Sequence, residues 1–139
     1  MFTKILVAAD GSPITRKVLN AASEISGMSG GELHLIYVIE TGWSEGDLAR
    51  ELVIKEMEEE SEAITMEMKK SLAATGKDVN VHIKRGHPGN TIINTAEEIG
   101  ADLIIIGSVG RSQIERMMAG SVSTYVVTHS RMPTLVIKP

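Results

Sequence analysis

The sequence predicts an α/β fold in which one open parallel sheet carries helices on both faces. Segments of strand length alternate five times with segments of helical periodicity, and right-handed crossovers turn such an alternation into a parallel sheet. One strand segment, residues 103–106, is apolar at every position, as is typical of a parallel strand covered on both sides. The chain has 139 residues and no repeat or linker, so residues 1–139 are expected to form one domain.

The first half of the chain predicts two strands and two helices. Residues 4–10, KILVAAD, form an apolar strand that leads directly into a helix, because Ser12 suits an N-cap and Pro13 suits the first helical position. A glycine cluster ends this helix before a second strand at residues 33–39, and a long second helix follows at roughly residues 44–75. The apolar stripes are Val18, Ala21, Ala22 and Ile25 in the first helix, and Leu48, Leu52, Ile64, Met68 and Leu72 in the second.

The second half predicts one strand at the edge of the sheet and one inside it. Residues 79–84 alternate between apolar and polar side chains, which indicates an edge strand with one face near water. The fully apolar segment 103–106 is expected to be central. A short strand at residues 134–138 closes the chain. The apolar positions of the two helices in this half are Ile92, Ile93, Ala96 and Ile99, then Val122, Val126 and Val127.

Composition excludes several classes of protein. Cysteine is absent, so neither a disulfide framework nor a thiolate metal site can form, which fits a cytoplasmic protein. A net charge of −4 gives no positive field for nucleic acid, and an aromatic content of 3% leaves few surfaces on which bases could stack. The N-terminal apolar run, residues 5–9, is too short for a signal peptide or a membrane span. We therefore expect no nucleic-acid or membrane partner.

A glycine-rich stretch, GSVGRSQIERMMAGSVS, connects the inner strand to the last helix. Gly107 and Gly110 let the backbone approach a ligand closely, and Gly120 and Ser121 stand where the helix could begin. Helix N-termini present unpaired N–H groups and a positive dipole end, so this placement predicts a phosphate site formed mainly by backbone amides. Taken singly, each glycine is more simply a turn residue, and Ser121 is more simply a helix cap.

Other chemical signatures are weak. No GxxxxGK[ST] occurs, and the first strand is followed by DGSP instead of GxGxxG, so neither a P-loop nor a dinucleotide site is favoured. Asp10, at the end of the first strand, could accept hydrogen bonds from ribose hydroxyls or could assist the helix cap. The four histidines have no metal-ligand spacing, and no Ser, His and carboxylate grouping stands out. No catalytic residue and no metal site are predicted.

Three segments together resemble the universal stress protein family over essentially the whole chain: KILVAADGS, GSVGRSQIERMMAGSVS and MPTLVIKP. In that family the pattern G-x2-G-x9-G-[S/T] marks the ATP-binding branch, and here Gly107, Gly110, Gly120 and Ser121 complete it. The resemblance implies an adenine nucleotide alpha hydrolase-like fold with strand order 3-2-1-4-5. It also implies ATP at the ends of the first and fourth strands.

Carried over position by position, the resemblance implies that Asp10 holds the ribose, with Ala8 and Ala9 beside it. Val38 would meet adenine through its backbone. Many relatives have proline before this aspartate where the present chain has two alanines. Gly86 matches a family glycine near the base, or it simply makes the turn before the third helix. The phosphates would be surrounded by Gly107, Gly110, Gly120, Ser121, Val122 and Ser123, with Arg111 reaching the terminal phosphate.

The leading expectation is an ATP-binding stress-response protein that acts as a nucleotide-dependent switch or sensor. Hydrolysis is expected to be slow or absent, because no base that would activate water is evident. Mg²⁺ is expected with ATP, since the motif supplies amides but few cations. The alternatives are a nucleotide-independent dimeric adaptor and a slow adenine-nucleotide-hydrolysing enzyme, although DGSP matches neither the HxGH nor the SGGxDS motif of related enzymes. AMP, ADP and a cyclic nucleotide are alternative ligands.

The last strand predicts a homodimer. Residues 134–138 have nothing after them to cover an open sheet edge, and exposed edges invite pairing. The family resemblance implies the same arrangement, in which two copies pair antiparallel through the last strand.

Overall fold

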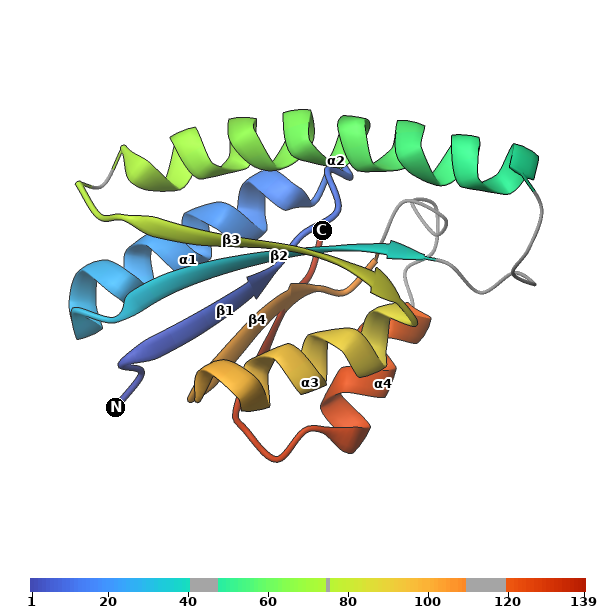
Figure 1. The fold of residues 1–139 in the computed structure, drawn as a ribbon. Coiled ribbons are helices and arrows are strands. Elements are labelled where there is room, and N and C mark those ends of the chain that lie inside the picture. Colours follow the sequence, from blue (N-terminus) through green and yellow to red (C-terminus); the bar gives the residue numbers. More distant parts are fainter. Residues whose placement is uncertain (41–47, 75, 110–119) are drawn as a thin grey trace.

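A computed structural model of the chain describes residues 1–40, 48–74, 76–109 and 120–139. It contains a five-stranded parallel sheet of order β3-β2-β1-β4-β5, which confirms the predicted fold class and strand order (Figure 1). The strands are β1 Lys4–Ala8, β2 Glu32–Glu40, β3 Val79–Gly86, β4 Leu103–Gly107 and β5 Thr134–Ile137. The helices are α1 Thr15–Ser29, α2 Leu48–Ala73, α3 Pro88–Ile99 and α4 Ser121–His129.

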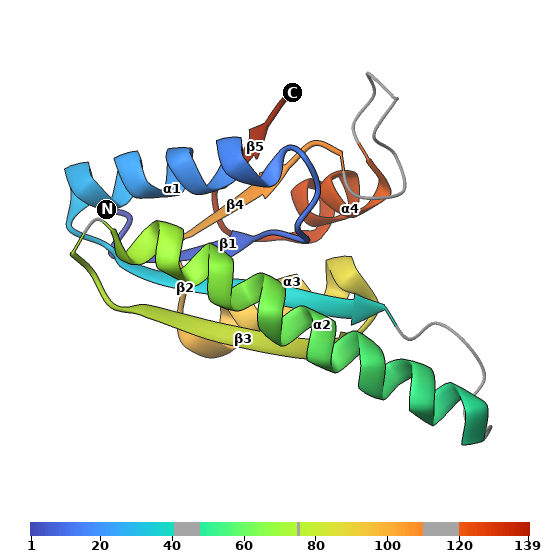
Figure 2. The same cartoon turned by 90° about the horizontal axis from the view of Figure 1, so that it is seen from above.

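Two helices cover each face of the sheet (Figures 1 and 2). On one face α1 lies against β1 and β4, while α2 lies against β2 and β3. On the other face α3 contacts β2 and β3, and α4 packs beside α3 and contacts β5. No helix within the described ranges is both long and apolar enough to cross a membrane.

Successive residues of the inner strands bury their side chains on opposite faces. In β1, Ile5 and Val7 belong to the core beneath α1 and α2, and Leu6 belongs to the core beneath α3 and α4. All three are fully buried. Alternate side chains of a strand point to opposite faces, so a sheet with two covered faces requires apolar residues at every position. That requirement explains the unbroken apolar runs of β1 and β4.

The alternating strand β3 and the fully apolar strand β4 lie where the sequence predicts. Among the described strands β3 is at an edge of the sheet and pairs with β2 alone, in a register that runs from Leu33 opposite Val79 to Glu40 opposite Gly86. β4 lies inside the sheet between β1 and β5. The carboxyl ends of β1, β2 and β4 therefore meet at one side of the molecule, on either side of the point where the strand order reverses.

The predicted start of the first helix is wrong. Ser12 is not the N-cap, because α1 begins at Thr15 with Ile14 in the cap position and has no side-chain cap. The amide of Ser12 donates instead to Asp10 Oδ1 at 2.9 Å, and its carbonyl accepts from the amide of Thr15 at 3.0 Å. The first bond forms an Asx turn and the second closes a backbone turn, so the chain completes these turns before it becomes helical.

Two predicted apolar positions are exposed. Leu52 of α2 is 62% exposed, whereas Ile54 in the same turn is 8% exposed, so Leu52 faces away from the buried side of the helix. Farther along the same helix Met68 and Leu72 are buried in the core, as predicted. Val127 of α4 is also exposed, whereas Val126 is buried. The side chain of Leu48 lies outside the described residues.

Candidate functional site

A cavity of about 300 Å³ opens at the carboxyl ends of β1, β2 and β4. The first turns of α1, α3 and α4 and one stretch of α2 complete its walls. In open parallel sheets ligands bind outside the carboxyl ends of the strands, at the point where the strand order reverses. Here that point lies between β1 and β4, so the fold itself makes this cavity the candidate site.

The structure brings together the predicted site residues that it describes, except for Gly86. Gly110 and Arg111 lie outside the described residues. Whether the other predicted residues contact a nucleotide stays a prediction, but they share one cavity although they come from segments far apart in the sequence. These lining residues are Ala8, Ala9, Asp10, Val38, Gly107, Gly120, Ser121, Val122 and Ser123.

Asp10 is held at the cavity wall by the turn that follows β1. Its Oδ1 accepts a hydrogen bond from the amide of Ser12 at 2.9 Å, and the residue is half-buried. The structure shows that Asp10 stabilises the turn before α1, where no side chain caps the helix, and hydrogen bonding to ribose hydroxyls stays a prediction. This bond fixes the direction of a carboxylate that lines the cavity.

The start of α4 forms the opposite wall. Gly120 occupies the N-cap position and provides no side-chain cap, so the role of Ser121 as N-cap is wrong. The Oγ of Ser123 donates to the carbonyl oxygens of Gly120 at 3.0 Å and Ser108 at 3.2 Å, and the amide of Gly120 also donates to Ser108. These bonds tie the first turn of α4 to the end of β4. The first amides of a helix have no intrahelical partner, so this turn can donate hydrogen bonds to an anionic ligand.

Two of the predicted glycines have structural roles that need no ligand. A Cβ at Gly107 would lie 2.8 Å from Cγ2 of Ile14, so the glycine lets α1 pack closely against the end of β4. Gly86 has a φ of 141° and ends β3 just before the first residues of α3. It does not line the cavity. The structure therefore favours the turn role that the sequence analysis gave as the alternative for Gly86.

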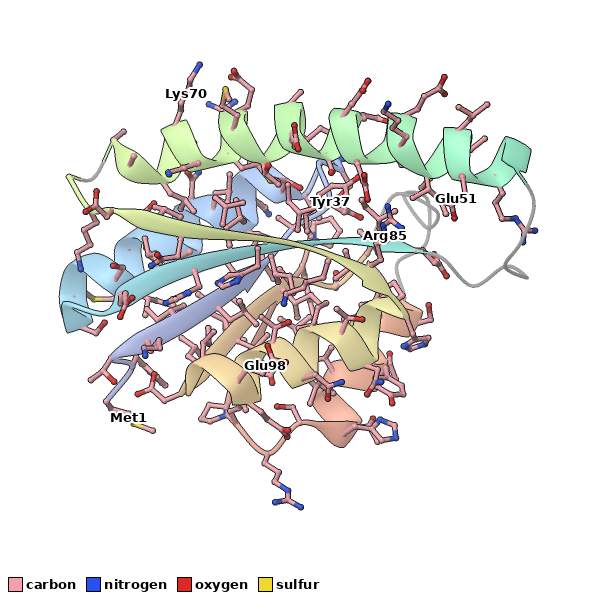
Figure 3. The ribbon with its side chains drawn as sticks, in the orientation of Figure 1. Met1, Tyr37, Glu51, Lys70, Arg85 and Glu98 are labelled. Atoms are coloured by element: carbon pink, nitrogen blue, oxygen red, sulfur yellow. The ribbon has the colours of Figure 1, made fainter. Side chains whose placement is uncertain are left out.

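The remaining walls are residues that the sequence analysis missed. Ile39 and Glu40 end β2, so the rule that sites form at strand ends could have found them. Met57 and Glu60 come from the middle of α2, where no local signal marks them. Tyr37 points from β2 to the side of the sheet that α2 covers (Figure 3). The missed lining residues are Ile14, Thr15, Val18, Ile36, Tyr37, Ile39, Glu40, Met57, Glu60, Pro88, Ile92, Ile106, Ser108 and Val109.

The cavity combines apolar walls with carboxylates. Asp10, Glu40 and Glu60 all line it, and none of the described lining residues is a lysine, arginine or histidine. Within the described residues no group of three or more His, Cys, Asp or Glu side chains could hold a metal ion. A divalent cation at this site would therefore need oxygen ligands from a bound molecule as well as from the protein.

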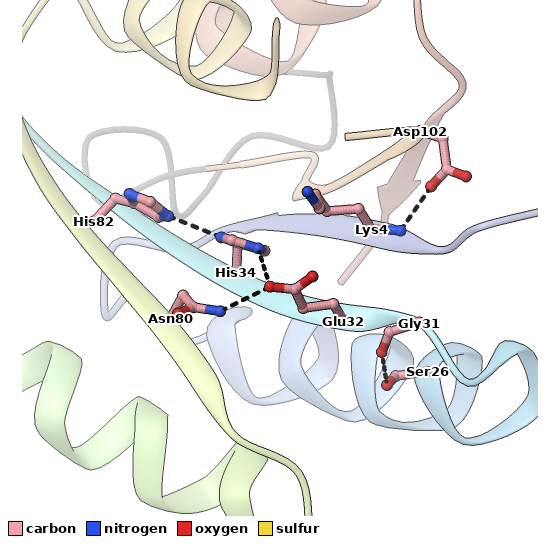
Figure 4. A network of polar contacts seen from close by, with 8 residues as sticks. All are labelled: Lys4, Ser26, Gly31, Glu32, His34, Asn80, His82 and Asp102. Atoms are coloured by element: carbon pink, nitrogen blue, oxygen red, sulfur yellow. Dashed lines mark hydrogen bonds and ion pairs between the residues drawn. The ribbon is translucent and has the colours of Figure 1, made fainter. Parts of the chain in front are cut away.

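A second polar cluster lies away from the cavity, on the sheet face that α3 covers (Figure 4). Nδ1 of His34 lies 2.9 Å from Nε2 of His82, and Nε2 of His34 lies 3.1 Å from Oε1 of Glu32. The amide of Asn80 donates to the same carboxylate oxygen at 3.2 Å. Burial is the main cause that lowers the pKa of His82, and the neighbouring His34 lowers it further. These histidines have no metal-ligand spacing in the sequence, and their contact could not be predicted because spacing alone does not show the register of two strands.

Comparison with known proteins identifies one family. The model of the universal stress protein family matches residues 1–138. Universal stress protein YxiE of Bacillus subtilis is 32% identical over 148 residues, which cover 99% of this chain and 100% of that protein. Universal stress protein MJ0531 of Methanocaldococcus jannaschii is 30% identical over 141 residues, covering 99% of this chain and 83% of that one. Universal stress protein UspA from Lactobacillus plantarum has a similar structure, with a TM-score of 0.86 at 25% identity over 98% of this chain and 97% of its own.

Two similar structures were solved with nucleotides. One is a universal stress protein in complex with cAMP, with a TM-score of 0.76 at 24% identity over 99% of this chain and 97% of that one. The other is the universal stress protein from Archaeoglobus fulgidus in complex with dAMP, with a TM-score of 0.74 at 23% identity over 99% of this chain and all of the other. At these identities the likeness shows a shared fold.

Proposed function

Because the chain belongs to the universal stress protein family, we propose that its cavity binds an adenine nucleotide and that the protein acts as a nucleotide-dependent switch or sensor in a stress response. The observation that carries this proposal is the placement of an uncapped helix N-terminus, that of α4, in the same cavity as Asp10. The N-terminus of α4 suits a phosphate group, and the carboxylate of Asp10 suits ribose hydroxyls. The cAMP and dAMP complexes of two proteins with this fold support adenine as the base.

We assign each part of the nucleotide to one wall of the cavity. Adenine would lie against the apolar side chains of Ile36 and Ile92 and would bond to the backbone of Val38. Asp10 would accept hydrogen bonds from the ribose, beside Ala8 and Ala9. The phosphates would bond to the amides at the start of α4. The residues proposed for the phosphates are Gly107, Gly110, Gly120, Ser121, Val122 and Ser123, with Arg111 at the terminal phosphate.

ATP is the nucleotide that we propose, because the chain contains the complete pattern G-x2-G-x9-G-[S/T] of the ATP-binding branch. Three carboxylates line the cavity, namely those of Asp10, Glu40 and Glu60. Like charges at short range repel each other, so a bare triphosphate would bind poorly beside them. Mg²⁺ prefers phosphate and carboxylate oxygens and reduces this repulsion. We therefore propose that ATP binds as its Mg²⁺ complex.

The proposal extends to the assembly and its location. β5 is an edge strand that pairs only with β4 among the described strands. We propose that two copies pair through residues 134–138 in a two-fold symmetric dimer and that the dimer acts in the cytoplasm.

Calorimetric titration tests the proposed ligand. ATP in the presence of Mg²⁺ is expected to bind with a stoichiometry of about one per chain, and an excess of chelator should weaken the binding. GTP serves as the control, since only the base differs. Absence of any binding by ATP, ADP, AMP or cAMP would contradict the proposed function. Equal ATP affinity with and without chelator would contradict only the proposed role of Mg²⁺.

A further inference from the structure

A chain of hydrogen bonds connects Glu32, His34 and His82 across the neighbouring strands β2 and β3 (Figure 4). Nε2 of His34 lies 3.1 Å from Oε1 of Glu32, and its Nδ1 lies 2.9 Å from Nε2 of His82. An ionised carboxylate can only accept hydrogen bonds, so a neutral His34 carries its hydrogen on Nε2 and accepts at Nδ1. A neutral His82 must then donate from Nε2. The partners thus fix the tautomer of both rings.

This arrangement limits how many protons the two rings can take up. A first additional proton can bind to Nδ1 of His82, because the Nε2–H of His82 still donates to His34. A second proton would have to bind to Nδ1 of His34, which is the acceptor of that bond. Two N–H groups would then face each other on positively charged rings whose centres lie 5.2 Å apart, and like charges at this range repel each other. Protonation of both rings therefore requires them to separate.

Burial makes a positive charge on either ring unfavourable. His34 is 7% exposed and His82 is half-buried, and removal from water disfavours the charged form of histidine. Burial is the main cause that lowers the pKa of His82, and His34 and Lys84 lower it further, whereas Glu98 raises it. At neutral pH the two rings are thus expected to be neutral and joined by their hydrogen bond.

Charged groups surround the two rings on each element packed against them. Glu32 of β2 bonds to His34. Lys84 of β3 and Glu98 of α3 form an ion pair of 3.9 Å, and Lys4 of β1 lies opposite Glu32 in the strand register. Among the described residues these positive and negative groups balance, so they provide no excess of negative charge for a second proton.

The hydrogen bond lies where the sheet can open locally. Among the described strands β3 pairs with β2 alone, so its displacement does not require β1 or β4 to move. Helix α3 follows β3 in the chain and contacts both β2 and β3. A bond between side chains of β2 and β3 therefore helps to hold this edge of the molecule together.

We propose that the His34–His82 pair is an acid-sensitive contact, whose hydrogen bond holds the edge strand β3 to β2 at neutral pH and whose double protonation loosens β3 and α3 on acidification. This inference goes beyond the proposed function and does not depend on it. It adds the proton as a second input to the protein. Ile36 lies opposite His82 in the register and also lines the cavity, so the contact is next to one wall of the proposed nucleotide site.

Hydrogen–deuterium exchange of backbone amides at about pH 7.5 and about pH 5 tests the contact, after correction for the intrinsic effect of pH on exchange. His82→Gln keeps an amide that can donate to His34 but cannot become charged. Asn80→Ala is the matched control, because the amide of Asn80 also bonds from β3 to β2, to Oε1 of Glu32 at 3.2 Å, and does not titrate. The amides of β4, inside the sheet, are the reference within each protein.

In the wild-type protein the protection of β3 relative to β4 is expected to fall about tenfold on acidification, which corresponds to a pKa difference of about one unit between the closed and open states. In His82→Gln the relative protection should change less than about twofold. Asn80→Ala should be less protected in β3 at both pH values, because it lacks a cross-strand bond, and should keep the tenfold fall.

Nitrogen-15 NMR of the imidazole rings is a second test that needs no variant. At about pH 7.5 both rings should be Nε2–H tautomers, with a scalar coupling across the hydrogen bond between Nδ1 of His34 and Nε2 of His82. On acidification the two rings should titrate in two separate steps, as expected for groups that hinder each other's protonation.

Three results would overturn the acid-sensitive contact. One is a wild-type protein in which the relative protection of β3 is the same at both pH values. Another is the same pH dependence in His82→Gln as in wild type, or its loss in Asn80→Ala to the same extent as in His82→Gln. The third is independent titration of the two rings. None of these results bears on nucleotide binding, so the proposed function stands or falls separately.

Discussion

Gly120 precedes α4 with φ −68° and ψ 162°, an extended backbone conformation that any residue can adopt. The backbone conformation therefore does not require glycine at position 120. At Gly107, by contrast, close packing against Ile14 leaves no space for a Cβ. A ligand that approaches the backbone would explain why position 120 has no side chain.

We predict that Gly120→Val retains the fold and binds ATP about 10- to 100-fold more weakly, because the branched side chain enters the space proposed for phosphate and breaks charge-assisted hydrogen bonds. Circular dichroism and calorimetry measure both properties. The contrasting variant is Gly107→Ala, whose Cβ would lie 2.8 Å from Ile14 and should destabilise the fold by about 1–3 kcal/mol. A valine variant that loses its fold together with its binding would show that Gly120 is structural.

His82 predicts how stability depends on pH. Its pKa is lowered from 6.5, first by burial, then by His34 and Lys84, while Glu98 partly opposes the shift. The unfolded chain, with an ordinary histidine pKa, binds the proton more readily than the folded chain does. The free energy of unfolding should therefore fall as the pH drops below about 6.5.

Replacing His82 with glutamine should make the free energy of unfolding less dependent on pH between about pH 7 and pH 5, the range in which a histidine titrates. Urea unfolding at several pH values measures this. An unchanged slope in the His82 variant would mean that another group causes the pH dependence.

Site residues near strand ends could be predicted from the sequence, and those contributed by packing could not. Asp10 and Gly107 follow apolar runs whose ends are visible in the sequence, and parallel topology brings such ends together. Thr15 was not predicted as a cavity residue, because the sequence suggested a helix that starts at Pro13. Glu60 was not predicted either, because its position depends on how α2 crosses the sheet, which no local pattern specifies.

Among the elements, β5 presents hydrogen-bonding groups to solvent in a defined pattern. The carbonyls of Pro133 and Ile137 accept from amides of the β4 segment. In a parallel ladder alternate residues bond to the same neighbour, so the N–H and C=O groups of Thr134 and Val136 face the open edge. These are the groups that a second copy would use.

Val136→Pro should convert the proposed dimer to a monomer. Proline removes the outward N–H of residue 136 from each copy and leaves in place the bond that the amide of Ser108, just after β4, donates to the carbonyl of Ile137. Loss of these bonds should weaken association at least about tenfold. Val136→Ala, which keeps the amide, should remain dimeric. Sedimentation velocity at micromolar concentration measures the change, and either a monomeric wild-type protein or a dimeric proline variant would contradict pairing through β5.

Most elements could be predicted because the fold buries both faces of the sheet. That requirement imposes unbroken apolar runs on β1 and β4, whereas the edge strand β3 directs Val79, Val81 and Ile83 to the core beneath α1 and α2 and has polar residues between them. The exposed Leu52 shows where such reasoning fails. Apolar residues at helical spacing suggest a buried stripe, but packing decides which side of the helix is covered, and the buried side of α2 includes Ile54 and not Leu52.

For the whole molecule, topology connects the family to the site. The strand order 3-2-1-4-5 came from the family resemblance, because alternation of strands and helices alone allows other orders. Once that order is set, the ends of β1 and β4 border the reversal point, and the cavity lies there. Asp10 and the start of α4, more than a hundred residues apart in sequence, become two walls of one cavity.

The measurement that tests adenine nucleotide binding most directly is mass spectrometry of the small molecules that the protein retains. The purified protein is incubated with an equimolar mixture of ATP, ADP, AMP, cAMP and GTP in the presence of Mg²⁺, desalted rapidly and denatured, and the released compounds are quantified. The account predicts that ATP is the main compound released, at about one molecule per chain, with little GTP. Release of no adenine nucleotide, or of GTP in equal amount, would contradict it.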